Sequence, residues 1–340
     1  MNSWKSWNVC LLAVVLLSGC TTEPQESDVD TSRPTEFGYQ TTPRTVRLQE
    51  GKAAYEFYCI GCHGENGLGD GPAARMLNPA PRNFQKAKFK FISTRFAELP
   101  TDEDLFRTIS TGLRGSSMPS WGHLPAQTRW ALVEYIKTFS DIWKRPPTPS
   151  IPFVTDPYVE MKDKSEAIKR GEVAYHGFFS CWNCHPAYVS EEKISEYSQE
   201  LGGPPRSGLR DNLNQSAIKK DEEDKTIFAP DFLRDYVKAG TSVDILYRSI
   251  AAGITGTAMP TWIDAAASGP EDEEGNKLVT QADIWAIAYY VQDLIKKREV
   301  MISPDDIVVR TNREMRIGES GMEYTAELPV VATEEFIEDE

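Results

Sequence analysis

The spacing of apolar residues predicts a largely helical chain. The stretches 101–111 and 242–252 have apolar residues at helical spacing, and either Thr101 or Asp102 is suited to cap the first of them. Two longer stretches, about 126–143 and 280–297, carry apolar residues on one face. We therefore expect amphipathic helices that pack together over most of the sequence.

One unit occurs twice in the chain, with its motifs in the same order. Each copy begins with Gly-x-x-Ala-Tyr, where we expect a helix to start, at Gly51 and at Gly171, and continues with Cys-x-x-Cys-His. The later matching stretches are 105-LFRTISTGLRGSSMPSW-121 with 246-LYRSIAAGITGTAMPTW-262, and 130-WALVEYI-136 with 285-WAIAYYV-291. Three ordered matches indicate an internal duplication.

The duplication predicts an all-α fold with two tandem domains, 46–143 and 166–298. The segment 144–165 between them contains five prolines, which interrupt helices, so we expect a linker there. The sequence ends in an acidic run, and residues 299–340 are expected to form a mostly irregular acidic tail.

The first 45 residues are typical of an export signal followed by a tether. Lys5 precedes an apolar run that suits a signal peptide but is too short to span a membrane. The run ends in Leu-Ser-Gly-Cys20, which resembles a bacterial lipobox, so residues 1–19 would be removed and Cys20 would be acylated. An ordinary signal peptide with an incidental cysteine is the alternative. Residues 20–45 are polar and contain prolines, as in a flexible tether.

The net charge and the hydropathy of the chain indicate its partners and its location. Acidic residues outnumber basic ones, 51 to 37, which gives a net charge of −14. Such a chain repels nucleic-acid phosphates, so we expect no nucleic-acid partner. The acidity suits docking with a basic partner, and the alternative is that it serves solubility alone. No later segment has about 18 uninterrupted apolar residues. We therefore expect a lipid-anchored protein on the periplasmic side of a bacterial membrane, inner or outer.

Both Cys-x-x-Cys-His motifs predict covalent attachment of haem c. Cysteines three residues apart share one face of a helical turn, so their sulfurs can add to the two vinyl groups of one porphyrin, and the next histidine can reach the iron. The predicted residues are Cys59, Cys62 and His63 in the first copy, and Cys181, Cys184 and His185 in the second. A redox-active dithiol would need a βαβ pattern and a zinc site would need a fourth ligand, and the sequence favours neither.

The repeat also supplies a candidate second axial ligand for each iron. Met118 and Met259 stand at equivalent positions, and the proline after each favours extended backbone that can hold the thioether at a haem face. The alternative is that both are ordinary core methionines. His123 and His176 are rival ligands, but neither has a histidine at the equivalent position, so surface or supporting roles are favoured.

Loops near the motifs suggest further haem contacts. A glycine-rich run follows His63 and would let the chain curl close to the ring edge. Arg82 in the first copy and Arg206 in the second are candidates for bidentate contacts with haem propionates. The alternative is that each is a solvent-exposed loop arginine.

These features together resemble two class I cytochrome c domains, over about 48–143 and 166–298. The glycine-rich run and the Pro-Arg-Asn-Phe that follows it resemble cytochromes that accompany membrane respiratory complexes, including the lipoprotein cytochrome of alternative complex III. The resemblance implies two haem c groups. The second copy departs from the pattern, because Pro186 follows its motif and a charged insertion around 217–225 precedes Met259.

Electron transfer is the function that two His/Met-ligated haems favour. Neither iron would have an open position for a substrate, so electrons would pass between redox partners or subunits of a respiratory complex. A dihaem oxidoreductase, peroxidase-like or sulfur-compound-oxidising, is the alternative. A peroxidase-like enzyme would need a haem with an open coordination position. The sulfur-compound-oxidising family uses a cysteine as haem ligand, and this chain has no further cysteine for that role. A docking subunit with secondary haems is a third hypothesis, which the duplicated ligand set disfavours.

Overall fold

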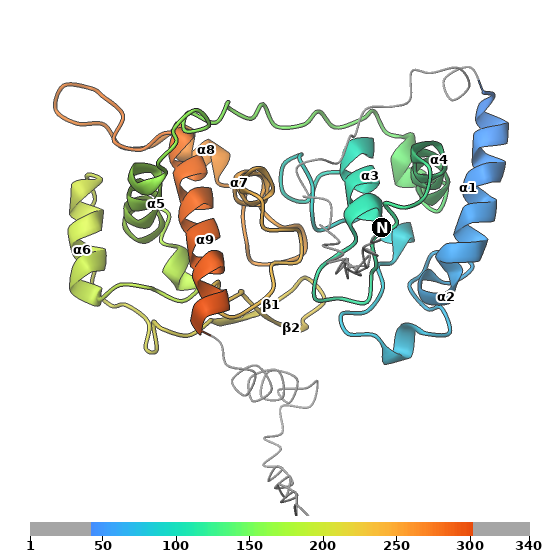
Figure 1. Ribbon diagram of the computed structural model, residues 1–340, viewed down its shortest axis with the longest axis horizontal. Coiled ribbons are helices and arrows are strands. Elements are labelled where there is room, and N and C mark those ends of the chain that lie inside the picture. Colours follow the sequence, from blue (N-terminus) through green and yellow to red (C-terminus); the bar gives the residue numbers. More distant parts are fainter. Residues whose placement is uncertain (1–41, 302–340) are drawn as a thin grey trace, which may run out of the picture.

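The computed structural model describes residues 42–301, which form helices, connecting loops and one small hairpin (Figure 1). The all-α fold class is thereby confirmed. The predicted signal peptide, the acylation site Cys20, most of the tether and most of the acidic tail lie outside the described residues. In chain order the elements, of which η marks short 3₁₀ helices, are α1 (Arg44–Tyr58), α2 (Ile60–His63), η2 (Ala74–Met76), η3 (Phe84–Lys86), α3 (Asp102–Thr111), α4 (Ala126–Lys137), η4 (Asp141–Lys144), α5 (Ser165–Gly177), η5 (Cys181–Asn183), α6 (Glu191–Glu200), β1 (Ile218–Lys220), β2 (Thr226–Phe228), α7 (Val243–Ala252), α8 (Ile263–Ala267) and α9 (Ala282–Met301).

Two large apolar cores divide the described chain into an N-terminal half, 42–144, and a C-terminal half, 145–301 (Figure 1). The first core joins α1, α3 and α4, and the second joins α5, α7 and α9. Each contains the same stacked aromatic pair. Phe106 lies on Trp130 with ring centroids 4.4 Å apart, and at the equivalent positions Tyr247 lies on Trp285 at 4.0 Å. The repeat in the sequence is thus matched by a repeat in packing.

The helices that contain Gly51 and Gly171 start well before these glycines, so the predicted starts are wrong. Both glycines lie mid-helix, where α1 crosses α4 and α5 crosses α9. A Cβ atom on Gly51 would lie 2.1 Å from the carbonyl oxygen of Ala131, and one on Gly171 would lie 2.0 Å from that of Ala286. Glycine therefore serves close helix packing at these positions, despite its low helix propensity.

The predicted linker packs against the C-terminal half. Residues 145–164 contain no helix, as their prolines predicted. Ile151 is nevertheless 3% exposed and donates its backbone N–H to the carbonyl oxygen of Ser93. Further along, the indole of Trp285 donates to the carbonyl oxygen of Val154 at 3.0 Å. The linker thus contacts both halves of the described chain.

The two halves meet through equivalent loops, each following α3 or α7. The backbone N–H of Arg114 donates to the carbonyl oxygen of Lys238, and that of Thr255 donates to the carbonyl oxygen of Lys90, each at 3.2 Å. Arg114 and Thr255 occupy equivalent positions of the repeat. Each half therefore offers the same loop to the other, as in an isologous contact.

The charged insertion of the C-terminal half forms the antiparallel hairpin β1–β2, the one sheet within residues 42–301. Its tip reaches the N-terminal half, where Lys88 pairs with Glu222 at 2.5 Å and Lys86 pairs with Glu223. The paired strand residues are Ile218 with Phe228, Lys219 with Ile227 and Lys220 with Thr226.

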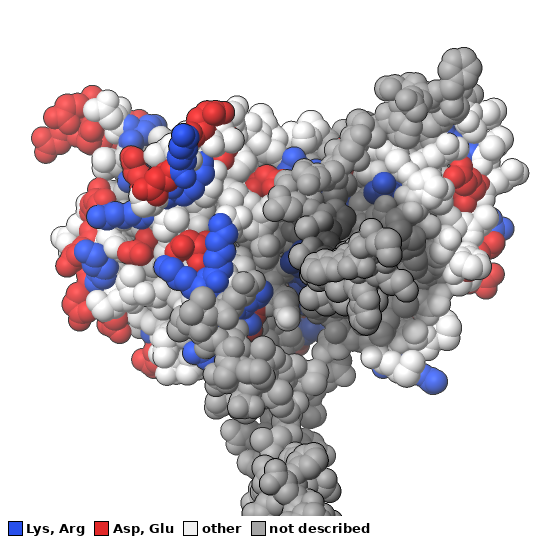
Figure 2. Space-filling view, viewed as in Figure 1, with Lys and Arg blue, Asp and Glu red and all other residues white. Residues whose placement is uncertain are grey.

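Charged side chains of both signs cover the visible face of the C-terminal half, and acidic ones gather on the loop between α8 and α9 (Figure 2). That loop contains Glu271, Asp272, Glu273 and Glu274. Among residues 42–301, no helix combines the length and the apolar character needed to cross a membrane.

Candidate haem sites

Each histidine of the two motifs is oriented by a backbone carbonyl oxygen. Nδ1 of His63 lies 3.0 Å from the carbonyl oxygen of Arg82, and Nδ1 of His185 lies 2.9 Å from that of Pro230. Because a carbonyl oxygen only accepts, Nδ1 carries the proton and Nε2 keeps its lone pair for a metal. Burial lowers the pKa of both imidazoles. Both rings are therefore held in the neutral form that binds metals.

A stacked phenylalanine and a buried tyrosine complete each histidine's surroundings. Phe84 stacks on the first histidine ring with centroids 4.4 Å apart, and Phe232 stacks on the second at 4.8 Å. The hydroxyl of Tyr55 donates to the carbonyl oxygen of the residue after the first histidine at 2.7 Å, and Tyr175 does the same in the second copy at 2.9 Å. The two motifs thus share three contacts.

The four motif cysteines are free, partly buried thiols. Burial, with a smaller contribution from Cys62, raises the pKa of Cys59 to about 12, and burial also raises the pKa of Cys181. A redox dithiol needs a lowered thiol pKa, so the structure does not support that alternative. Nor does any group of three His, Cys, Asp or Glu side chains within residues 42–301 have the arrangement that a bound metal ion needs. The zinc alternative therefore has no support either.

The two Met-Pro loops share one backbone arrangement. The carbonyl oxygen of Met118 accepts the N–H of Leu113, and that of Met259 accepts the N–H of Ile254, each at 3.0 Å. The N–H of each methionine donates to a hydroxyl two residues earlier, at 3.2 Å and 3.1 Å. Both methionine side chains are half-buried. The loops are therefore fixed in the same way in both halves.

A glycine at the end of α3 and of α7 lets each loop return to its helix. Gly112 has φ 67° and Gly253 has φ 78°, in the left-handed region that favours glycine. A Cβ atom on Gly112 would lie 2.7 Å from the carbonyl oxygen of Met118, and one on Gly253 would lie 2.8 Å from that of Met259. These glycines thus set the path of the backbone that carries the methionines.

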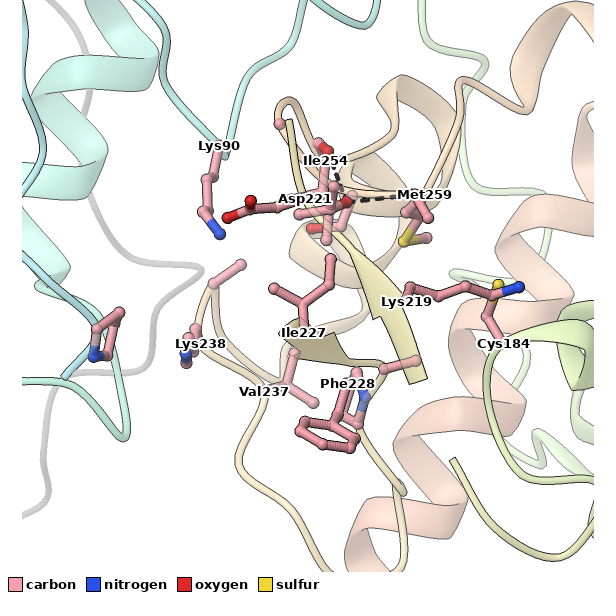
Figure 3. Close-up of a pocket in the computed structure, with 18 of the residues that line it drawn as sticks. Lys90, Cys184, Lys219, Asp221, Ile227, Phe228, Val237, Lys238, Ile254 and Met259 are labelled. Atoms are coloured by element: carbon pink, nitrogen blue, oxygen red, sulfur yellow. Dashed lines mark hydrogen bonds between the residues drawn. The ribbon is translucent and has the colours of Figure 1, made fainter. Parts of the chain in front are cut away.

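A cavity of about 1840 Å³ lies beside the second motif and extends between the halves (Figure 3). Cys181, Cys184, His185 and Met259 all line it, so the four residues predicted for the second haem border one space. Ordinary small-molecule pockets measure roughly 300–1,000 Å³, so the space is large enough for a porphyrin. Paired thiols, a neutral imidazole and a thioether are together the donor set that haem c requires. These residues fit the group.

The two predicted arginines both line this cavity but differ in their surroundings. The guanidinium of Arg206 donates to the carbonyl oxygen of Gly177 at 2.8 Å, and its buried Nε has no partner within the described residues. Burial lowers the pKa of Arg82, whose own carbonyl oxygen holds the first histidine. Pro230 occupies the position equivalent to Arg82, so the two arginines are not counterparts in the repeat.

Sequence reasoning missed two lysines that line the cavity, Lys90 and Lys238. Each stands six residues after the phenylalanine that stacks on a motif histidine, Phe84 or Phe232. That shared spacing is a signal in the sequence, but it becomes visible only when the phenylalanines are known to correspond. Arg210 was also missed, and its guanidinium bonds the backbone around the second motif.

The two remaining histidines have the surface and supporting roles that the sequence favoured. His123 is exposed. His176 is completely buried, and its Nδ1 lies 2.8 Å from the carbonyl oxygen of Glu172 while its Nε2 accepts the N–H of Tyr188 at 3.2 Å. Because both ring nitrogens are engaged, His176 supports the backbone beside the second motif and has no nitrogen available for iron.

Two comparisons with known proteins agree with this chemistry. Residues 46–136 match the family model described as cytochrome C oxidase, cbb3-type, subunit III. A chain of the Kuenenia stuttgartiensis reducing HAO-like protein complex Kustc0457/Kustc0458 is similar at 29% identity with a TM-score of 0.53, and the match covers 73% of this chain and 96% of that chain. None of the curated proteins matches.

The fold, the motifs and these matches define a class of protein. The chain contains a c-type cytochrome domain, a class of haem domain that transfers electrons through haem c and its iron. The family match lies within the first copy, whereas the structural match extends over more of the chain than one copy contains.

Proposed function

We propose that the protein is a dihaem cytochrome that carries one haem c in each half and transfers electrons without transforming a substrate. The first haem would be attached through Cys59 and Cys62, and the second through Cys181 and Cys184. The proposed axial ligands are His63 with Met118, and His185 with Met259. Bound haem supplies a one-electron iron couple, and its thioether bonds keep it attached in an exported protein.

The observation that carries this proposal is the duplicated set of contacts. In both halves a carbonyl oxygen orients the histidine, a phenylalanine stacks on it, a tyrosine hydroxyl fixes the next residue and a glycine positions the Met-Pro loop. A chain that needed one haem alone would have no reason to keep both sets. A methionine on each iron would close the sixth position, which favours electron transfer over catalysis.

We further propose that the protein works on the periplasmic side of a bacterial membrane, held by a lipid on Cys20, as a tethered carrier or a complex subunit. The similar chain comes from a complex of two named proteins, which supports a redox partner for this chain as well. The acidic loop between α8 and α9 suits a basic docking surface on such a partner. Replacing Cys20 with serine should move the protein from the membrane to the soluble fraction.

The axial ligands can be tested by the near-infrared band that reports sulfur-to-iron bonding in the oxidised protein. Met118→Ala and Met259→Ala should each remove about half of the band, because each half contributes one Met-ligated iron. Met76→Ala is the matched control, since this side chain is 75% exposed. A band that neither loop variant changes would show that the methionine assignment is wrong.

Carbon monoxide binding separates electron transfer from the dihaem enzyme alternative. With both irons six-coordinate, the reduced protein should bind carbon monoxide slowly and incompletely at both haems. Rapid binding at one haem of the protein as isolated would point to an open site and favour the enzyme.

A further inference from the structure

Three basic side chains gather in the cavity between the two halves. Arg82 and Lys90 come from the N-terminal half and Lys238 comes from the C-terminal half, and all three line the cavity. Figure 3 shows Lys90 and Lys238 at the same end of this space, with the carboxylate of Asp221 beside Lys90. Basic residues from both halves thus meet in the cavity that borders the second candidate haem site.

The backbone at both lysines is fixed by the opposite half. The carbonyl oxygen of Lys90 accepts the N–H of Thr255, and the carbonyl oxygen of Lys238 accepts the N–H of Arg114. The donors belong to the two Met-Pro loops at equivalent positions. The position of each lysine is therefore tied to the methionine loop of the other half.

Nearby carboxylates balance this charge only in part: burial lowers the pKa of Arg82 more than Glu222, Glu223 and Asp221 raise it. Within residues 42–301, the side chains of Arg82, Lys90 and Lys238 form no hydrogen bond or ion pair of their own. Burial and then the nearby cations Arg82 and Lys238 lower the pKa of Lys90, although Asp221 and Glu222 oppose this shift. Burial also lowers the pKa of Lys238.

The acidic hairpin tip is largely committed elsewhere. Glu222 pairs with Lys88 and Glu223 pairs with Lys86, so each of these carboxylates already has a lysine partner on the N-terminal half. Asp221 uses one carboxylate oxygen to accept two N–H groups of its own turn, each at 2.9 Å. The carboxylates nearest to the three partly buried cations are therefore shared with other partners, and such a cluster is suited to bind additional anions.

We propose that Arg82, Lys90 and Lys238 form one anion site, shared by both halves, that receives haem propionate carboxylates. This proposal rests on the dihaem proposal, because it requires propionate carboxylates from the haem of each half to reach the cavity. Positive charge beside a haem favours its reduced state, so the shared site raises both reduction potentials. It also links the two haems electrostatically, since the same cations act on each.

The test is a spectroelectrochemical titration of the haem-loaded, full-length protein. Lys90→Gln and Lys238→Gln should each lower both midpoint potentials, by a threefold to tenfold change in each reduction equilibrium, where tenfold corresponds to about 59 mV for one electron. Lys90→Arg keeps the charge and should keep both potentials. Lys52→Gln removes the same charge on the exposed surface of α1 and should leave them unchanged.

The outcomes distinguish this proposal from the one it rests on. Two haems per chain with unchanged potentials in both glutamine variants would overturn the shared anion site alone. A shift confined to one haem in both variants would overturn the sharing between halves. Fewer than two haems in the wild-type protein would overturn the dihaem proposal and this one with it.

Discussion

The two halves secure equivalent histidines by different means. In the N-terminal half the carbonyl oxygen of His63 accepts the backbone N–H of Gly69 at 2.9 Å, within the glycine-rich loop that follows the motif. In the C-terminal half the carbonyl oxygen of His185 accepts the guanidinium of Arg210, also at 2.9 Å. One half uses a short local loop, and the other uses a side chain from a distant segment.

This difference indicates which contacts around the motif histidine are required and which can vary. Three contacts are the same in both halves: a carbonyl oxygen and a stacked phenylalanine on the histidine ring, and a tyrosine hydroxyl on the carbonyl oxygen of the next residue. The loop that closes the motif varies, and in the C-terminal half it leaves room for α6 and the β1–β2 hairpin. Substitutions in the shared contacts should therefore affect both halves alike, whereas substitutions in the closing loop should affect one.

Among the substitutions that should affect both halves equally, those at the helix crossings should reduce stability most. Gly51→Ala and Gly171→Ala should each reduce the free energy of unfolding by more than about 3 kcal/mol, because the new Cβ atom meets a carbonyl oxygen of the facing helix. Chemical denaturation measures this. Gly61→Ala is the control, since its Cβ would have no neighbour within 4 Å, and it should change stability by less than about 1 kcal/mol. Tolerance of alanine in one half alone would contradict the equivalence of the crossings.

Arg210 should be essential to the C-terminal half only. Arg210→Met should cost about 3 kcal/mol, because several carbonyl oxygens lose a charged donor at once. Hydrogen exchange should show lost protection around the second motif and none around the first, and Arg234→Met, at a 45% exposed side chain, is the control. The carbonyl oxygens concerned belong to Trp182, His185, Asn212, Leu213 and Gln215.

Buried His176 has no histidine counterpart in the N-terminal half, so it gives the C-terminal half a pH dependence of its own. Burial lowers its pKa from 6.5 to about 4, so the folded protein favours the neutral ring. The resulting stability is fully present above the unfolded pKa and is lost as the pH falls from 6.5 towards 4. In the haem-loaded protein the loss should be about 2 kcal/mol between pH 7 and pH 5. His176→Gln should remove this part of the pH dependence, and an unchanged pH profile would argue against a neutral His176.

The tyrosine hydroxyls should give the smallest effects and the closest match between halves. Tyr55→Phe and Tyr175→Phe each remove one buried hydrogen bond to the residue after the motif histidine. Each should cost about 1 kcal/mol in thermal unfolding. Tyr236→Phe, at a 64% exposed side chain, should cost nothing measurable. Costs that differ strongly between the two halves would show that the shared contacts are not equally important.

Features encoded locally were predictable from the sequence. The start of α3 was predictable because its cap is adjacent in the sequence: the hydroxyl of Thr101 accepts the backbone N–H of Asp104. The motif cysteines and histidines and the Met-Pro loops were also predictable, because each is defined by residues that are adjacent in the sequence. Features that depend on distant segments could not be predicted from the sequence. The carbonyl oxygens that orient the histidines lie 19 and 45 residues downstream, at unequal separations from the motif, and the role of Gly51 requires knowledge of the facing helix.

The most direct test of one haem in each half is mass spectrometry of the protein purified from its native membrane, before and after proteolysis. The intact chain should carry the mass of two haems. The peptides that contain 59–63 and 181–185 should each carry one. A full-length chain in which either peptide is found only without haem would contradict the account.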